Sequence, residues 1–204
     1  MKRTLAAPND PLLQKVSQEI PIESITQPET QELIEEMLDV AYDNRIDRTK
    51  PTVVGLAAPQ VGISKQIILV DIGASKRGGL SNLQVYINPK ITWQSEEQDE
   101  WCEGCWSTSR VAGAVSRASR IKLEAYTREG KKVIEEHEGY VARIFQHELD
   151  HLQGQEFISR IADPEKLHWV EKEEWVEYKA NEGWRDWPKK CSREKWEKIK
   201  GTTQ

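Results

Sequence analysis

The sequence is poor in cysteine and contains no long apolar run. Three cysteines occur among 204 residues, and so small and odd a number argues against a disulfide framework. No stretch of about 18 apolar residues is present, which excludes a membrane-spanning helix. The first residues also lack the apolar segment of a secretory signal and the arginine-rich, acid-poor pattern of a transit peptide. We therefore expect a cytoplasmic protein that spans no membrane.

A strong excess of charge of one sign is also lacking. The formal net charge is −5, which predicts no general attraction to DNA or to anionic lipid. The length suits one domain with a substantial core. Residues from 164 onwards differ from the rest, because they are rich in charge and carry five of the eight tryptophans. We expect one domain over residues 1–165 and, over residues 166–204, a charged, tryptophan-rich helical extension that packs on it and is not a separate domain.

Hydrophobic periodicity predicts a mixture of helices and strands. Apolar residues recur at helical spacing from Thr30 to Asn44, and a second helix opens at Gly139 and should end at Gly154. Strand patterns and their turns follow the rules for β-branched runs bounded by glycine, proline or asparagine. We expect one strand at Gln66–Asp71 and a second at Val85–Trp93, with a break at Asn88-Pro89. Ser116–Tyr126 and Lys131–His137 should form a hairpin around a turn at Glu129-Gly130. A further turn is expected at Lys76–Ser81. Strands with segregated helices predict an α+β fold.

The second predicted helix carries a motif with clear chemistry. Residues 147–151 read His-Glu-Leu-Asp-His, and positions i and i+4 share one helix face, so His147 and His151 can bind one metal ion. A bound metal would lower the pKa of its water, and Glu148 could take the proton, as in metal-assisted hydrolysis. A surface helix with two unrelated histidines is the alternative, and it is disfavoured because the chain has only four histidines.

A catalytic metal site usually has a third protein ligand and an open position. The candidates downstream follow no known ligand pattern: Glu156, Asp163, Glu165 and His168. Upstream, Cys105 stands in the segment Glu103-Gly104-Cys105-Trp106-Ser107. Gly104 would let the backbone turn closely around a ligand. The residues alone leave the third ligand open.

Three motifs, in this order, resemble the peptide deformylase family. They are Val-Val-Gly-Leu-Ala-Ala-Pro-Gln at 53–60, Glu-Gly-Cys-Trp-Ser at 103–107 and Gln-His-Glu-Leu-Asp-His at 146–151. The resemblance covers about residues 5–165, and three ordered motifs are far more specific than one. It implies mixed and antiparallel sheets around a central metal-binding helix, with an N-terminal helix and a helical C-terminal tail. It also implies a metal-dependent hydrolase that removes the formyl group from the N-terminal methionine of N-formylmethionyl peptides.

The resemblance implies a role for each matching residue. Cys105, His147 and His151 would be the metal ligands, and Glu148 would act first as base and then as acid. Gln60 and the backbone N–H of Trp106 would stabilise the oxyanion. The substrate would meet the backbone of Gly55 and a methionine pocket lined by Val54, Tyr140, Arg143 and Ile144. Fe(II) would be the metal, and one thiolate with two imidazoles also suits Ni, Co or Zn.

The sequence departs from the family pattern at three positions around the expected site. Val53 replaces a glycine, Trp106 replaces a leucine, and Ala112 stands where an arginine is usual. If the family's glycine needs a positive φ, Val53 would strain its loop, and otherwise it would narrow the cleft. These changes concern substrate fit more than chemistry, since the ligands and the base are intact.

Three other functions remain open at this point. An amidase with an altered acyl-peptide substrate would keep the same site. A metalloprotease would take its third ligand from downstream, whereas a non-enzymatic binding protein would need the chemistry to be broken. The basic end of the tail also predicts a contact with the RNA of the ribosome, through Lys189, Lys190, Arg193, Lys195, Lys198 and Lys200.

Overall fold

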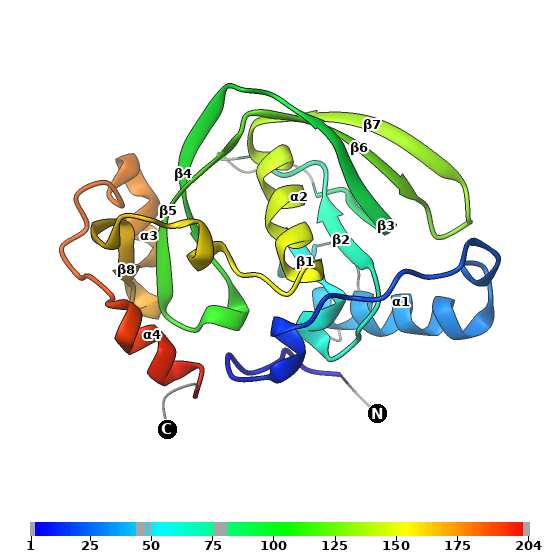
Figure 1. Cartoon of the computed structure of the whole chain (residues 1–204), viewed down its shortest axis with the longest axis horizontal. Helices are drawn as coiled ribbons and strands as arrows, with labels where there is room; N and C mark the ends of the chain where they lie inside the picture. The colour runs from blue at the N-terminus through cyan, green and yellow to red at the C-terminus, as the bar shows by residue number, and fades with distance from the viewer. Residues whose placement is uncertain (1–2, 44–47, 49, 76–80, 202–204) are drawn as a thin grey trace.

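The computed structural model describes residues 3–43, 48, 50–75 and 81–201. Two antiparallel sheets surround a central helix, α2 (Gly139–Leu152), as Figure 1 shows. The first sheet has the order β1-β2-β3-β6-β7, and the second has the order β4-β5-β8. The strands of the first sheet are β1 (Gly55–Ala57), β2 (Ile67–Asp71), β3 (Leu83–Gln94), β6 (Arg120–Tyr126) and β7 (Lys132–Glu138). Those of the second are β4 (Gln98–Gly104), β5 (Val111–Ala118) and β8 (Leu167–Trp169).

Strand β2 lies in the middle of the hydrophobic core, and all five of its residues are buried. Ile67 and Leu69 pack in one cluster with helix α1 (Pro28–Ala41), whereas Ile68 and Val70 pack in another with α2. A strand covered on both faces needs a continuous apolar run rather than an alternating one. This is why residues 67–70 are uniformly aliphatic, and the predicted strand is confirmed.

Helix α2 is confirmed with the predicted start and stop. Its last turn closes through two backbone bonds, from Gly154 N–H to His151 O at 3.1 Å and from Gln155 N–H to Asp150 O at 2.9 Å. This arrangement needs a left-handed residue just after the helix, and Gly154 has φ 67°. A Cβ on Gly154 would also lie 2.7 Å from the Gln14 carbonyl. The end of α2 is therefore fixed by a glycine.

Two strand predictions were wrong in part. Strand β3 does not break at Asn88-Pro89 but passes through it with a shift of register. Asn88 has φ 48° and its side chain exchanges two hydrogen bonds with the backbone of Ile20, so a bulge replaces the expected break. Ser116 to Ala118 belong to β5, not to the β6–β7 hairpin, whose predicted turn at Gly130 is confirmed. Strand β4 was not predicted.

Two other predicted segments extend beyond the described residues. Helix α1 ends at Ala41, and Asn44 lies outside the described residues, as do residues 76–80 of the predicted turn. Within the part of the chain that the structure describes, no helix has the length and apolarity that a bilayer crossing requires. The α+β class is confirmed by the antiparallel sheets and the packed helices.

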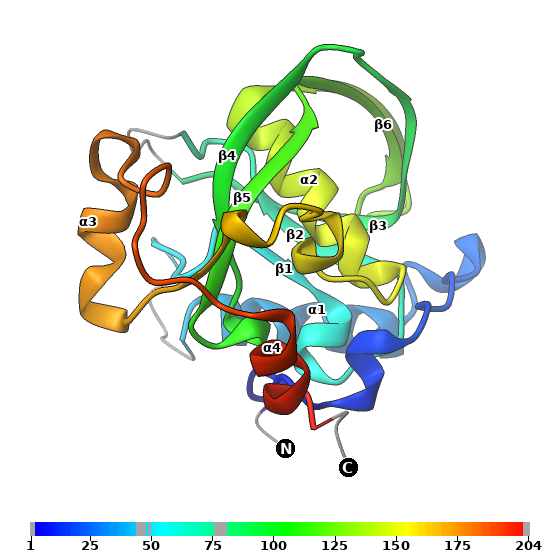
Figure 2. The same cartoon turned by 60° about the vertical axis from the view of Figure 1, so that its left-hand side comes forward.

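The C-terminal extension folds back along the second sheet, as Figure 2 shows. It contains strand β8, helix α3 (Trp175–Lys179) and helix α4 (Arg193–Ile199), together with short 3-10 turns. Strand β8 pairs with the start of β5, so a strand accompanies the helices that were expected. The extension's tryptophans Trp184 and Trp196 are buried against residues of β4, β5 or the segment after α2.

Candidate metal centre

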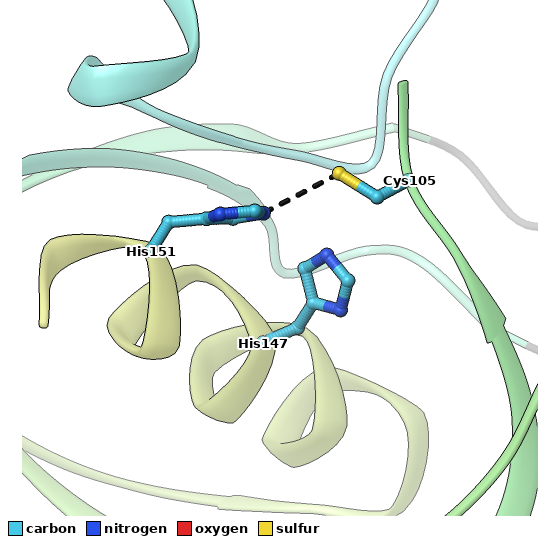
Figure 3. A group of neighbouring side chains, drawn as sticks. All are labelled: Cys105, His147 and His151. Carbon is cyan, nitrogen blue, oxygen red and sulfur yellow. Dashed lines mark hydrogen bonds between the residues drawn. The ribbon is translucent and has the colours of Figure 1, made fainter. Parts of the chain in front are cut away.

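The three predicted metal ligands lie together at the heart of the fold. Cys105 follows the end of β4, whereas His147 and His151 stand one turn apart on α2. One ligand atom from each of the three lies within 4.8 Å of the others, and no other such group of His, Cys, Asp or Glu occurs among the described residues. Cys105 Sγ lies 3.3 Å from His151 Nε2 (Figure 3). The downstream candidates take no part in this group.

A buried carboxylate orients the first histidine. Glu103 Oε2 lies 2.9 Å from His147 Nδ1, which directs the opposite ring nitrogen, Nε2, toward the cluster. The same carboxylate accepts hydrogen bonds from Arg117 at 2.6 and 2.8 Å and from Arg143 at 2.7 Å. Burial alone would raise the pKa of Glu103, but the charge and hydrogen bonds of Arg117, together with His147, hold it well below its usual range. Glu103 is therefore an anion beside the ligands.

The charge network continues to the second half of α2. Arg117 Nη1 donates to Asp150 Oδ2 at 2.9 Å, and Arg160 binds both oxygens of the same carboxylate. Asp150 thus connects α2 to β5 and to the segment that follows α2. The sequence indicates no role for Glu103 or Arg117, because their pairing depends on contacts between strands β4 and β5.

Glu148 is placed to exchange a proton inside this site. Its side chain is buried, and its Oε2 has no hydrogen-bond partner among the described residues. Burial raises its pKa to about 7, so the carboxyl can both take and give a proton near neutral pH. Strand β1 passes very close to it: a Cβ on Gly55 would collide with Oε1 and lie 2.9 Å from Cδ of Glu148. Glycine is needed here for this close approach.

Gln60 presents its amide N–H to the cluster in a fixed orientation. It lies in the 3-10 turn Ala58–Val61 that follows β1. The N–H of Ala57 donates to Gln60 Oε1 at 2.7 Å, which leaves Nε2 facing Cys105 Sγ at 3.0 Å and Ser107 Oγ at 3.3 Å. The amide nitrogen is therefore a donor aimed at the metal ligands.

The predicted substrate residues lie partly on the surface and partly inside the fold. Val54 is exposed, with 43% of its surface accessible, and it precedes Gly55 in the chain. Trp106, which was predicted as a backbone donor and not as a substrate residue, is also exposed, at 62%, and follows Cys105. On α2, Tyr140 is half-buried and Ile144 is buried, with its Cγ2 only 2.8 Å from a Cβ placed on Gly55. The guanidinium of Arg143 points instead to Glu103 and to the backbone of Val115, so only its alkyl stem could touch a substrate.

The three departures from the family pattern have different surroundings. Val53 is buried in the core cluster of α1 and β2 and does not have a positive φ, so it neither strains the loop nor fills a cleft. Ala112 is buried in β5, opposite His168 of the extension. Trp106 alone presents a large side chain to solvent beside the ligands.

The donor set fits a divalent transition metal. One thiolate and two imidazoles suit zinc and the neighbouring first-row ions, and the three-ligand count leaves a position open. The unpartnered Oε2 of Glu148 fits a water or substrate held at that open position.

Comparison with known proteins identifies the family. A family model described as polypeptide deformylase matches residues 2–167. The chain belongs to the peptide deformylase family. Curated deformylase relatives include those of Halothermothrix orenii, 42% identical over 74% of this chain and 88% of the relative, and Desulfitobacterium hafniense, 39% identical over 69% and 83%.

Solved deformylase structures share the fold. The peptide deformylase of Thermotoga maritima is 33% identical with a TM-score of 0.67, covering 80% of this chain and 99% of its own. That of Acinetobacter baumannii, described as bound to Met-Ala-Ser, is 30% identical with a TM-score of 0.70, covering 79% and 99%. Like its family, this deformylase is a hydrolase that removes the N-formyl group from nascent polypeptides.

Proposed function

We propose that this deformylase uses one metal ion held by Cys105, His147 and His151, with Glu148 as the proton carrier. The observation that supports this most directly is the convergence of three ligand atoms within 4.8 Å beside a buried carboxyl with an unpartnered oxygen. When bound, the ion would polarise the formyl carbonyl and activate the attacking water. A site with an upstream cysteine ligand favours the deformylase over a protease, whose third ligand would come from downstream.

Glu148 would act twice in one turnover. Its Oε2 accepts a proton from the water as the oxygen attacks the formyl carbon, which forms the new C–O bond. It then gives that proton to the nitrogen of the methionine as the C–N bond breaks, which yields formate and a free amine. A pKa of about 7 suits a group that must be base and acid in turn.

Gln60 would stabilise the negative oxygen that develops during the attack. Its Nε2 already points into the cluster, because Ala57 N–H holds the other end of the amide. The backbone N–H of Trp106, the residue after Cys105, is the second donor that we propose. A single donor of this kind is worth about 3 kcal/mol in the transition state.

The substrate that we propose is an N-formylmethionyl peptide. The Met-Ala-Ser bound to the relative from Acinetobacter baumannii has the sequence expected for a product of such a peptide. Gly55 would pair with the peptide backbone, and Val54, Tyr140, Ile144 and the stem of Arg143 would line the methionine pocket. A different acyl group remains the second candidate, since the exposed indole of Trp106 changes the rim of the site.

The metal that we propose is Fe(II); the cysteine and histidine donors also suit Ni, Co or Zn. A contact with the ribosome through α4 is a further proposal, supported by its exposed lysines Lys195 and Lys198. Replacing both lysines with glutamate should reduce the amount of protein that co-sediments with ribosomes and make co-sedimentation less sensitive to salt. Unchanged co-sedimentation would rule this contact out. A cytoplasmic location and the lack of DNA binding stay predictions.

Formate release tests the proposed function. Under anaerobic conditions, the Fe(II)- or Ni(II)-loaded protein should release formate from formyl-Met-Ala-Ser. The Glu148→Ala variant should release formate more slowly, by about 10²- to 10⁴-fold. The acetylated peptide serves as the control and should yield no acetate. Absence of formate from a protein with full metal occupancy would reject the activity on this peptide. Release of acetate would instead support the altered acyl substrate.

A further inference from the structure

The segment that carries Cys105 is held from outside the catalytic domain. We call residues 104–111 the ligand loop; it joins the end of β4 to the start of β5. Its own bonds are few, chiefly those between Thr108 Oγ1 and the backbone of Cys105 and Val111. Residues 169–175 of the extension contact both of its ends. These residues lie beyond the family match, which ends at residue 167.

At the first end, the indole of Trp175 packs directly on Gly104. A Cβ on Gly104 would collide with Cη2 of the indole and lie 2.9 Å from its Cζ2. Gly104 does not have a positive φ, so the missing side chain, not a special backbone turn, is what this position requires. The residue before the metal ligand is thus shaped to receive an aromatic ring from the extension.

The indole itself is firmly supported. Trp175 meets the fully buried ring of Tyr178 edge-on, with centroids 5.5 Å apart, and Lys179 Nζ lies 5.2 Å from the centroid of its ring. Tyr178 also shares its hydroxyl with His168 Nδ1 at 3.0 Å. The ring that covers Gly104 is therefore part of a packed aromatic cluster rather than a mobile surface group.

At the second end, the extension binds Arg110 in two ways. The N–H of Val170 donates to Arg110 O at 2.9 Å, and Glu171 forms an ion pair with the Arg110 guanidinium. Between the two ends lies Ser109, with φ 60° and ψ −116°, a strained conformation for a residue with a side chain. Such strain persists only where the surrounding structure enforces it. The bonds to Arg110 supply that constraint next to the strained residue.

We propose that the extension is a clamp for the ligand loop, with Trp175 as the main positioning residue and Glu171 as its second contact. The proposal rests on the metal site proposed above. His147 and His151 are positioned by the helix, and His147 also by Glu103, whereas Cys105 is the ligand whose backbone lies in a loop. A displacement of about 1 Å at such a group can cost about 10²-fold in rate, so the loop needs an external support.

The test compares Trp175→Ala with Trp184→Ala in the full chain loaded with Co(II). Trp184 is the matched control, because it is buried in the same aromatic cluster but stacks edge-on against Trp101, not against the ligand loop. Trp175→Ala should weaken Co(II) binding about 10- to 100-fold in competition with a chelator. It should also change the thiolate-to-cobalt absorption and lower kcat more than it raises KM.

The control and two milder variants separate positioning from stability. Trp184→Ala should lower Tm at least as much as Trp175→Ala but keep the wild-type Co(II) spectrum and affinity. Trp175→Phe should restore most of the affinity, because a ring still covers Gly104. Glu171→Gln, which leaves the aromatic cluster intact, should shift the spectrum in the same direction by a smaller amount.

The outcomes distinguish this proposal from the metal site itself. Wild-type spectrum, affinity and kcat in both Trp175→Ala and Glu171→Gln would overturn the clamp and leave the metal site standing. Equal spectral changes in Trp184→Ala and Trp175→Ala would also overturn it, since the effect would then be general loss of packing. A wild-type protein with no thiolate-to-cobalt band would overturn the metal site and the clamp together.

Discussion

At the scale of single residues, the site depends on close approaches that only particular side chains allow. Gly55 is the clearest example, because β1 runs so near α2 that a Cβ would meet both Glu148 and Ile144. The carboxyl of Glu148, the proposed base, is thereby packed between strand β1 and its own helix. The position of the Glu148 carboxyl therefore depends on the absence of a side chain at Gly55.

Replacing Gly55 with alanine should therefore act on catalysis. The added methyl group would displace the carboxyl of Glu148, so we expect kcat to fall by about 10²-fold while the metal content stays at the wild-type level. The measurement is formate release with metal analysis of the same sample. Ile134→Ala, at an exposed position of β7 that has no assigned role in the site, is the control and should keep kcat within about threefold, in the range of ordinary surface changes. A Gly55→Ala protein with normal kcat would show that Glu148 has room to move.

Gln60 allows a test of the oxyanion donor with little change of shape. Gln60→Glu keeps an oxygen for the Ala57 N–H but replaces the donor that faces Cys105. We expect kcat to fall by about 10²- to 10³-fold with little change of KM, as for loss of one oxyanion donor. Steady-state kinetics on the formylated peptide measures this. An equal rise of KM with unchanged kcat would mean that Gln60 serves binding only.

At the scale of secondary-structure elements, a buried charge network joins β4, β5 and α2. Arg117 of β5 donates to Glu103 of β4 and to Asp150 of α2, and all three side chains are buried. Breaking a buried ion pair on one side costs about 3–5 kcal/mol, because it leaves a charge without its partner. The network therefore couples the stability of the fold to the orientation of His147.

Arg117→Met should destabilise the protein by about 3 kcal/mol, the lower end of that range, since Arg143 and Arg160 still bind the two carboxylates. Urea denaturation at neutral pH measures the difference. Arg120→Met, at an exposed position of β6, is the matched control and should change stability by less than about 0.5 kcal/mol. Equal effects of the two substitutions would show that the buried network adds nothing to stability.

The elements that the sequence predicted well are those with local signals. Helix α2 has apolar spacing and a glycine stop, and β2 has an uninterrupted aliphatic run. Strand β4 lacks a clear local signal, because Gln98–Gly104 alternates weakly and carries three acidic residues. The one that is buried, Glu103, is compensated by Arg117 and Arg143, which are distant in sequence. In the same way, the bulge at Asn88 depends on bonds to Ile20, which no local pattern contains.

The same distinction applies to the site. His147, Glu148 and His151 follow from helical spacing, since one turn sets all three. Cys105 followed only from the family resemblance, because a strand end and a helix must meet in space before the thiol can join the imidazoles. The pairing of Trp175 with Gly104 had no sequence signal, and the glycine was first interpreted as a turn residue.

At the scale of the whole molecule, the extension is built into the body rather than attached to it. Its residues complete two hydrophobic clusters together with β4, β5 and the segment after α2. The basic residues of its end also have partners within the chain, such as Glu156 for Lys200 and Glu174 for Lys189. We therefore expect residues 166–204 not to fold alone, and the single domain inferred from the sequence stays a prediction.

Because of this packing, we expect the stability of the fold to depend on pH through His168. His168 is buried between the Tyr178 hydroxyl and the Glu165 carbonyl, and burial lowers its pKa from 6.5 to about 4. The unfolded chain therefore binds one more proton than the folded chain between these two values. The stabilisation from a neutral His168 is complete above pH 6.5 and is lost as the pH falls toward 4, by at most about 1.4 kcal/mol per unit.

His168→Gln removes this titration and so isolates its contribution. The wild type should be more stable than the variant near pH 7, and the difference should shrink steadily as the pH falls to about 4.5, because only the wild-type fold must exclude a proton that its unfolded chain binds. Urea denaturation of both proteins across this pH range measures the difference in their free energies of unfolding. The titrations of carboxylates that the two proteins share cancel in this difference. A difference that stays constant with pH would mean that His168 has the same pKa in the folded and unfolded chains, and that the packing of the extension does not exclude the proton.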